Sequence, residues 1–210
     1  MALQLQQIWD NEEARRRLMS VLQAWNRARS SGDAAQQLLA AEMLNKLLAG
    51  SSTRDLRQPQ QTVERLLDFP SHRLAVYGSL APGKKNHHMM AGMEGTWRKA
   101  TLRGTLHNAG WGAGQGFPGF AWDGTDTPIA AQVFTSRDLP DHWQRLDDFE
   151  GPEYRRTLVP VEILPQQAKV GLPPHQAKGA PVGDPGLAGD PEIENGEIKI
   201  CNVYELSESP

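Results

Sequence analysis

Glu150 is the strongest acid–base candidate in the chain, and it lies in the stretch HWQRLDDFEG, residues 142–151. Trp143, Leu146 and Glu150 are spaced as i, i+3 and i+7, so a helix places this carboxyl on the same face as two apolar side chains. Burial and the negative end of a helix both raise the pKa of such a carboxyl. A carboxyl that titrates near neutral pH can transfer protons. The alternative is that Gly151 ends the helix and leaves Glu150 solvated.

A second candidate site follows the strand-like run RLAVYG, residues 73–78. Gly78 permits a sharp turn, so the amides of Gly78, Ser79 and Leu80 can point into one concavity. Successive amide N–H groups in that arrangement bind an oxyanion or a carboxylate. The alternative is an ordinary strand that ends in a turn.

The same loop nearly matches a phosphate-binding motif, GxxxxGK[ST]. Gly78 is followed after four residues by Gly83 and Lys84, but Lys85 stands where the motif needs a hydroxyl for magnesium. Pro82 also removes an amide that the motif uses. Nucleotide binding is therefore a separate hypothesis, and it predicts magnesium-dependent binding of ATP or GTP.

Other pairs of residues could bind a ligand. Arg155 and Arg156 could clamp a carboxylate, although in a strand only one of the two faces a given site. His87 and His88 could bind a metal, but adjacent helical residues point apart and no carboxylate pattern accompanies them. Cys201 lies in a strand-like run and is expected to be buried and unreactive. For the tryptophans, core packing is expected before pocket lining; they include Trp97, Trp111 and Trp122.

The elements that position these residues divide the chain into three parts. Residues 1–70 hold few Gly and Pro, and capping signals at Asp10 and Asp33 predict a helical hairpin, with a shorter helix after Pro59. From residue 72, strand-like runs and one helix alternate irregularly, which favours an α+β domain with a curved or closed antiparallel-rich sheet. Residues 166–196 are rich in Pro and Gly and are predicted to be a mobile insertion between the last two strands.

The N-terminal helices carry apolar stripes that need a partner. Leu18, Leu22 and Trp25 recur at helical spacing in the first helix of the hairpin. Leu39, Met43 and Leu47 do so in the second. These stripes must be buried either on the following domain or on another subunit.

Length and composition exclude several classes of protein. The 210 residues suffice for one domain with a core and a small appendage. The formal net charge of −3 provides no strong positive field for nucleic acid. Cys201 is the one cysteine, so no intramolecular disulfide is expected. No apolar run approaches the roughly 20 residues of a membrane helix, and the N-terminus lacks the pattern of a signal peptide. We therefore expect a cytoplasmic protein without membrane or nucleic-acid partners.

Two stretches together resemble the signatures of the gamma-glutamylcyclotransferase-like family, whose members include AIG2-like and gamma-glutamylamine cyclotransferase-like proteins. VYGSLAPGKKNH, residues 76–87, is similar to the opening pattern YG[ST]L…G…NH, and RLDDFEGPEYRR, residues 145–156, to the second pattern LD…EG…Y.R. Between them, LRGTLHNAG followed by FPG at 117–119 resembles a third segment. The resemblance covers about residues 73–164 and the final strand IKICNVYEL, and it leaves out the N-terminal helices. Ala131-Gln132 departs from the Gly-Glu of many members.

The resemblance implies a small closed six-stranded mixed β-barrel with flanking helices over residues 72–206, preceded by the helical extension of residues 1–70. It implies that Glu150 is the catalytic acid/base. It further implies a set of residues that bind the γ-glutamyl group: Tyr77, Gly78, Ser79, Leu80, Asn86 and Tyr154.

The implied reaction is intramolecular and belongs to the transferase or lyase type. The α-amine of a γ-glutamyl amine or γ-glutamyl amino acid attacks its own side-chain amide and yields 5-oxoproline and a free amine. The implied chemistry requires no metal and no organic cofactor. A non-catalytic module is the alternative, in which the pocket binds a small acidic metabolite and the N-terminal helices form a homodimer or bind a partner protein.

Overall fold

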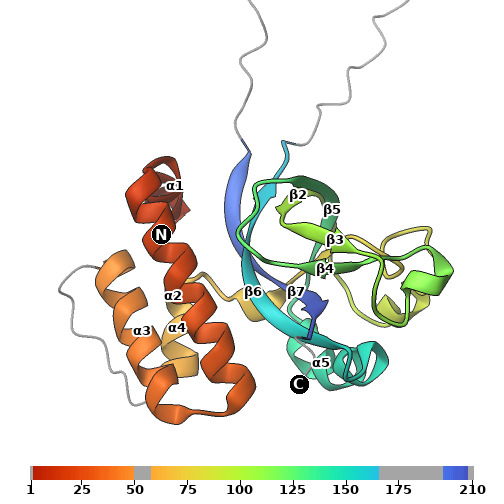
Figure 1. Cartoon of the computed structure of the whole chain (residues 1–210), viewed down its shortest axis with the longest axis horizontal. Coiled ribbons are helices and arrows are strands. Elements are labelled where there is room, and N and C mark those ends of the chain that lie inside the picture. Colours follow the sequence, from red (N-terminus) through yellow and green to blue (C-terminus); the bar gives the residue numbers. More distant parts are fainter. Residues whose placement is uncertain (1, 50–57, 166–195, 208–210) are drawn as a thin grey trace, which may run out of the picture.

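The computed structural model describes residues 2–49, 58–165 and 196–207, and it places a group of helices beside a small barrel (Figure 1). The predicted insertion at 166–196 lies outside the described residues, apart from Gly196. Within the described part of the chain, no helix combines the length and the apolar character that crossing a membrane requires.

A closed, mixed β-sheet forms the barrel, which confirms the predicted α+β class and the barrel architecture. The strands follow the order β1-β5-β2-β6-β7. Their bounds are Arg73–Val76 (β1), Thr96–Arg103 (β2), Pro128–Thr135 (β5), Tyr154–Ile163 (β6) and Glu197–Leu206 (β7). Neighbouring strands run antiparallel except at the closure, where β1 pairs with β7 in parallel and Leu74 lies opposite Asn202.

The closed sheet of the described residues has five strands, one fewer than the resemblance implies. Two short strands, β3 (Thr105–His107) and β4 (Gly119–Ala121), pair in a separate sheet. Gly104 separates β2 from β3 with a φ of 155°, a conformation that residues with a Cβ rarely adopt. A Cβ at Gly104 would also lie 2.5 Å from the carbonyl oxygen of Ala121. The chain therefore leaves the barrel at this glycine.

Strands β6 and β7 are buried on both faces. Val159 and Cys201 point into the barrel core, which also contains Leu102, Phe120 and Val133. The alternate residues of the same strands point outward into a second apolar cluster, which they share with the N-terminal helices: Leu158, Ile198 and Ile200. Cys201 is fully buried, as predicted, and burial raises the pKa of its thiol to about 12.

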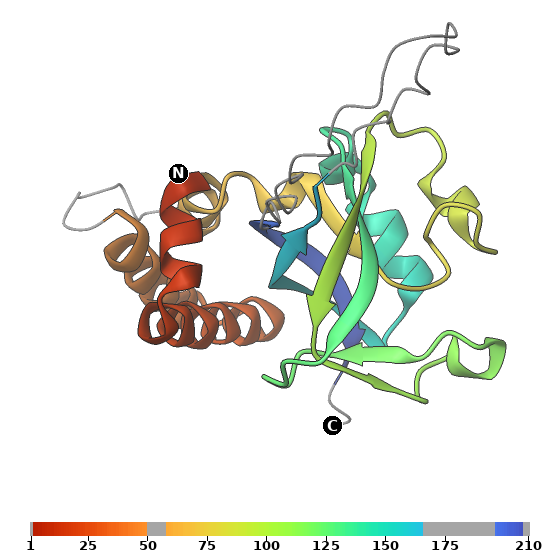
Figure 2. The ribbon, with the colours of Figure 1, turned by 90° about the horizontal axis from the view of Figure 1, so that it is seen from above.

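Four α-helices precede the barrel in the described residues, and they lie on one side of it in both views (Figures 1 and 2). They are α1 (Ala2–Asp10), α2 (Glu12–Ser31), α3 (Ala34–Ala49) and α4 (Pro59–Leu66). Asp33 accepts a hydrogen bond from the Gln36 amide (3.0 Å), as its capping role predicts. The prediction for Asp10 is wrong, because Asn11 caps α2 and accepts from the Ala14 amide (2.9 Å), while Asp10 ends the separate helix α1.

Helix α2 packs directly against the barrel. Leu18, Leu22 and Trp25 are buried in the cluster that includes Leu158 and Ile200, so the predicted stripe of this helix is covered by β6 and by the neighbouring helices. Most of the other predicted stripe is exposed: Leu39 is 49% exposed and Met43 46% exposed, and only Leu47 is partly buried against the same cluster.

Helix α3 buries a different face from the predicted one. The apolar residues of α3 are not confined to one face of the helix. The face that is buried contains Ala40, Ala41 and Leu44. The small alanine side chains allow the backbones of α2 and α3 to approach closely. Spacing alone cannot choose between two apolar faces of one helix.

Helix α5 (Leu139–Glu150) covers another part of the barrel surface. Trp143 and Leu146 are buried with Leu74 and Val76 of β1 in a third apolar cluster. The guanidinium of Arg156 lies 4.1 Å from the centre of the Trp143 ring and so covers its outer face. This packing fixes the direction in which the last turn of α5 presents its side chains.

Candidate active site

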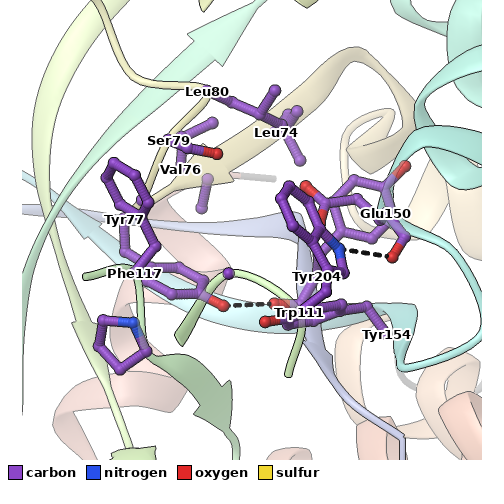
Figure 3. Close-up of a pocket in the computed structure, with 14 residues that line it drawn as sticks. Leu74, Val76, Tyr77, Ser79, Leu80, Trp111, Phe117, Glu150, Tyr154 and Tyr204 are labelled. Atoms are coloured by element: carbon purple, nitrogen blue, oxygen red, sulfur yellow. Dashed lines mark hydrogen bonds between the residues drawn. The ribbon is translucent and has the colours of Figure 1, made fainter. Parts of the chain in front are cut away.

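A narrow cavity lies where the end of β1, the loop before β4 and the C-terminal end of α5 meet (Figure 3). Six of the seven site residues suggested by the sequence line it: Tyr77, Gly78, Ser79, Leu80, Glu150 and Tyr154. In Figure 3, Ser79 and Leu80 lie on one side of the cavity and Glu150 and Tyr154 on another. The fold thus brings the two separate sequence stretches together.

Glu150 is the last residue of α5, where it lines the cavity and is half-buried. Gly151 stops the helix with a φ of 72°, and its amide donates to the Asp147 carbonyl (3.0 Å). Trp111 donates its indole N–H to the Glu150 backbone carbonyl (3.0 Å), which closes the cavity around this residue. Burial raises the pKa of the Glu150 carboxyl to about 7.

The loop after β1 is held by its own hydrogen bonds. The Ala81 amide donates to the Gly78 carbonyl (3.2 Å), and the Asn86 amide donates to the Ser79 carbonyl (3.0 Å). Among the described residues, the amides of Gly78, Ser79 and Leu80 have no hydrogen-bond acceptor. They are therefore available to an anionic group of a ligand.

Asn86 is the one predicted site residue that does not line the cavity. It is buried behind the loop, and its side-chain amide donates to the Ser79 hydroxyl oxygen (3.0 Å). The contact orients Ser79, so Asn86 reaches the cavity only through that side chain.

The three tyrosines of the cavity wall hydrogen bond with the protein itself. The Tyr77 hydroxyl donates to the Tyr204 carbonyl (3.2 Å) and accepts from the Phe120 amide (3.0 Å), so it joins β7 to β4. The Tyr204 hydroxyl donates to the Asp147 carboxylate (2.6 Å). Tyr154 forms a hydrogen bond with the backbone of Gly112. Burial raises the pKa of all three hydroxyls, so they stay protonated at neutral pH.

Sequence reasoning missed part of the cavity wall, including Trp111, Phe117 and Tyr204. Core packing was the first expectation for Trp111, but its ring lies at the cavity and meets Phe149 edge-on, with 5.4 Å between the ring centres. The available signal was the run GWGAGQGFPG, residues 110–119. Such a glycine-rich run predicts a loop, and in the structure it forms only a short 3-10 helix, Ala113–Gln115, before β4, yet it contains two large aromatic residues.

The room inside the cavity is small, about 40 Å³. That volume accommodates only a few water molecules. Trp111 and Phe117 are half-buried and belong to the loop before β4, whereas the opposite wall belongs to the barrel. A larger ligand therefore needs these two rings to shift outward.

A substitution at Gly110 tests whether the position of Tyr154 depends on the close approach of this loop. A Cβ at Gly110 would lie 2.6 Å from the ring carbon Cζ of Tyr154, and the φ of Gly110 is 84°. We expect Gly110→Ala to displace Tyr154 and to lower the free energy of unfolding by about 2–4 kcal/mol. Chemical denaturation measures the stability, and near-ultraviolet circular dichroism reports the environment of the tyrosine.

Gly116→Ala is the matched control. Gly116 has nearly the same φ, 82°, but a Cβ there meets nothing within 4 Å. It carries the backbone strain without the ring clash, so it should cost only about 1 kcal/mol. Equal losses in the two variants would mean that Tyr154 does not depend on the close approach of Gly110.

Comparison with known proteins places this chain in a family. A sequence model described as gamma-glutamyl cyclotransferase, AIG2-like, matches residues 74–181, which is just over half of the chain. No curated protein matches the chain.

Several solved structures are similar to this chain. YkqA from Bacillus subtilis is 23% identical, with a TM-score of 0.40, and the match covers 64% of this chain and 35% of that protein. An AIG2-like protein from Mus musculus is 21% identical, with a TM-score of 0.41, over 66% of this chain and 80% of that one. A glutathione-specific gamma-glutamyl cyclotransferase from yeast is 14% identical, with a TM-score of 0.35, over 63% and 67%. This chain spans only about a third of the length of YkqA. From the matched sequence model, we conclude that the chain belongs to the AIG2-like gamma-glutamyl cyclotransferase family.

Proposed function

We propose that this protein converts a γ-glutamyl amine or a γ-glutamyl amino acid into 5-oxoproline and a free amine. Glu150 serves as the general acid/base, and the loop from Tyr77 to Leu80 binds the γ-glutamyl group. One observation carries the proposal: a half-buried carboxyl with a pKa of about 7 shares a cavity with a loop of unpaired amides. Family membership supports the reaction class.

The proton transfers of the reaction suit a single carboxyl. The α-amine of the substrate is protonated at neutral pH, and it must lose a proton before its nitrogen can attack the γ-carbonyl carbon. Glu150 accepts that proton, and a C–N bond forms to close the ring. Glu150 then delivers a proton to the leaving nitrogen as the original amide C–N bond breaks, and the second proton that the ring nitrogen must lose passes to the released amine, which departs as an ammonium ion. A pKa near 7 lets one group perform both steps at neutral pH.

The loop amides suit the charges of the substrate. Attack on the amide carbonyl produces an oxyanion, and the substrate also carries an α-carboxylate. The N–H groups of Gly78, Ser79 and Leu80 have no acceptor among the described residues, so they can donate to either group once Trp111 and Phe117 admit the substrate. The aromatic wall excludes water and holds the chain of the substrate folded, which brings the amine to its own carbonyl.

The direct test is release of 5-oxoproline from a panel of γ-glutamyl amines, γ-glutamyl amino acids and glutathione. We expect release from at least one member of the panel, and the productive member names the leaving amine. A folded protein that releases 5-oxoproline from none of them would contradict the proposal.

A specific observation favours the alternative of a non-catalytic binding module. Leu38, Leu39 and Met43 of α3 are 38–49% exposed, which is unusual for three apolar side chains on one helix. Such a face suits the partner protein or second copy that this alternative assigns to the N-terminal helices. If the alternative holds, calorimetry would show that the protein binds 5-oxoproline or a γ-glutamyl compound, and no turnover would follow.

A further inference from the structure

A second cavity adjoins the candidate active site. Tyr154 and Tyr204 line both cavities. The second cavity has a volume of about 430 Å³ and is far roomier than the first. The N-terminal helices contribute part of its wall through Arg29 and Gln60, whereas they contribute nothing to the described wall of the first cavity.

Positive charge dominates the wall of this cavity. Arg29 of α2 and the adjacent Arg155 and Arg156 of β6 line it, and Asp147 is the one carboxylate among its described lining residues. Asp147 is already engaged, because Arg156 binds both of its oxygens at 3.0 Å. Arg155 contacts Glu205 outside the cavity at 2.9 Å.

Arg29 forms no ion pair among the described residues, although the charges of Asp147 and Glu64 act favourably on it from a greater distance. Its guanidinium donates to the backbone carbonyl of Arg156, and no described carboxylate lies within ion-pair distance of it. Burial, together with the positive charge of Arg156, lowers the pKa of Arg29 to about 10. The group stays charged at neutral pH, although it is partly desolvated beside a like charge. An anion in the cavity would stabilise this arrangement.

We propose that the second cavity binds a compact oxyanion, a carboxylate or phosphate group, between Arg29 and Arg156. The planar fork of the Arg29 guanidinium suits two oxygens of one such group, whereas Arg156, whose Nε and Nη2 are held by Asp147, contributes mainly its charge. Ser30 and Gln60 also line the cavity and add neutral hydrogen-bond donors. The site rests on the cavity and its arginines, so it stands whether or not the proposed cyclotransferase reaction occurs.

The oxyanion has two potential sources. One is a carboxylate on the leaving amine of a substrate that extends past Tyr154, and the other is a separate small molecule. Inorganic phosphate is the probe, because it is a compact oxyanion like the group expected from either source. We expect calorimetry on the full chain at pH 7 and low ionic strength to detect phosphate binding.

A pair of charge variants on α4 gives the decisive comparison. Gln60 and Gln61 are adjacent and both exposed, so replacement by Glu threatens the fold at neither position. Only Gln60 lines the cavity. We expect Gln60→Glu to weaken phosphate binding about tenfold and Gln61→Glu to weaken it less than about twofold. Equal weakening by the two variants, or no phosphate binding by the wild type, would overturn the proposal.

A second pair on α2 tests the arginine itself. Arg29→Met should abolish phosphate binding, and Arg27→Met, at an exposed position two residues away, should leave it unchanged. If Arg29→Met fails to fold, the comparison of Gln60 with Gln61 still decides. The source of the oxyanion follows from competition between phosphate and a γ-glutamyl substrate. If phosphate competes with the substrate in the wild type but not in Gln60→Glu, the substrate carries the oxyanion. Phosphate that binds without competing identifies a separate small molecule.

Discussion

Replacing Glu150 by Gln is expected to lower the rate of 5-oxoproline release by about 10³-fold or more. Gln has nearly the same shape as Glu but can neither accept the proton of the α-amine nor return one to the leaving nitrogen. General acid–base catalysis contributes roughly 10²–10⁴-fold, and here one group performs both transfers. In the wild type, kcat/KM should rise as the pH passes through about 7, where the carboxyl ionises. A variant with a wild-type rate would contradict the assignment of Glu150.

The same substitution has an internal control for folding, because it should stabilise the protein at high pH. The pKa of Glu150 is raised from 4.5 to about 7 in the folded state. Below pH 4.5 both states hold the proton, so the carboxyl contributes no pH dependence. Between pH 4.5 and 7 the unfolded state loses its proton first, and stability falls by about 3 kcal/mol in total. Chemical denaturation should therefore find Glu150→Gln more stable than wild type at pH 8 and equal to it at pH 4.

Replacing Asn26 by Ala is expected to lower the free energy of unfolding by about 3–5 kcal/mol. The side-chain amide of Asn26 donates to the Leu158 carbonyl (2.8 Å), and its oxygen accepts from the Leu158 amide (2.9 Å). Strand β2 pairs with β6 only near Ile163, so Asn26 supplies the hydrogen bonds that a neighbouring strand would make at Leu158. Alanine leaves two buried backbone groups unsatisfied, each at a cost of about 1–3 kcal/mol.

Arg27→Ala is the control for Asn26→Ala. Arg27 is the next residue of α2 and is exposed, so its replacement should change stability by less than about 0.5 kcal/mol. Urea denaturation of both variants gives the comparison. A loss below about 1 kcal/mol in Asn26→Ala would show that water replaces the Asn26 amide and that α2 is not anchored to β6 through this residue.

The local pattern of the sequence determined those features that depend on one segment alone. The spacing of Trp143, Leu146 and Glu150 predicts a helix with an acid on its apolar face, and α5 has that form because neighbouring turns of a helix share a face. The cap at Asp33 follows equally from local hydrogen bonding. Both groups of the proposed site, the carboxyl and the loop amides, were identified from their own segments.

Only the tertiary structure decided which faces and segments meet. It joined Trp111 and Phe117 to Glu150, buried the alanine face of α3, and closed the barrel with five strands. It also placed Arg29 beside Arg156, although 126 residues separate them in the chain. The physical reason is that the spacing of apolar residues shows that a helix or strand face must be buried, but it does not show which other element covers that face. Long-range pairs such as Asn26 with Leu158 depend on the shapes of both partners, which no single segment encodes.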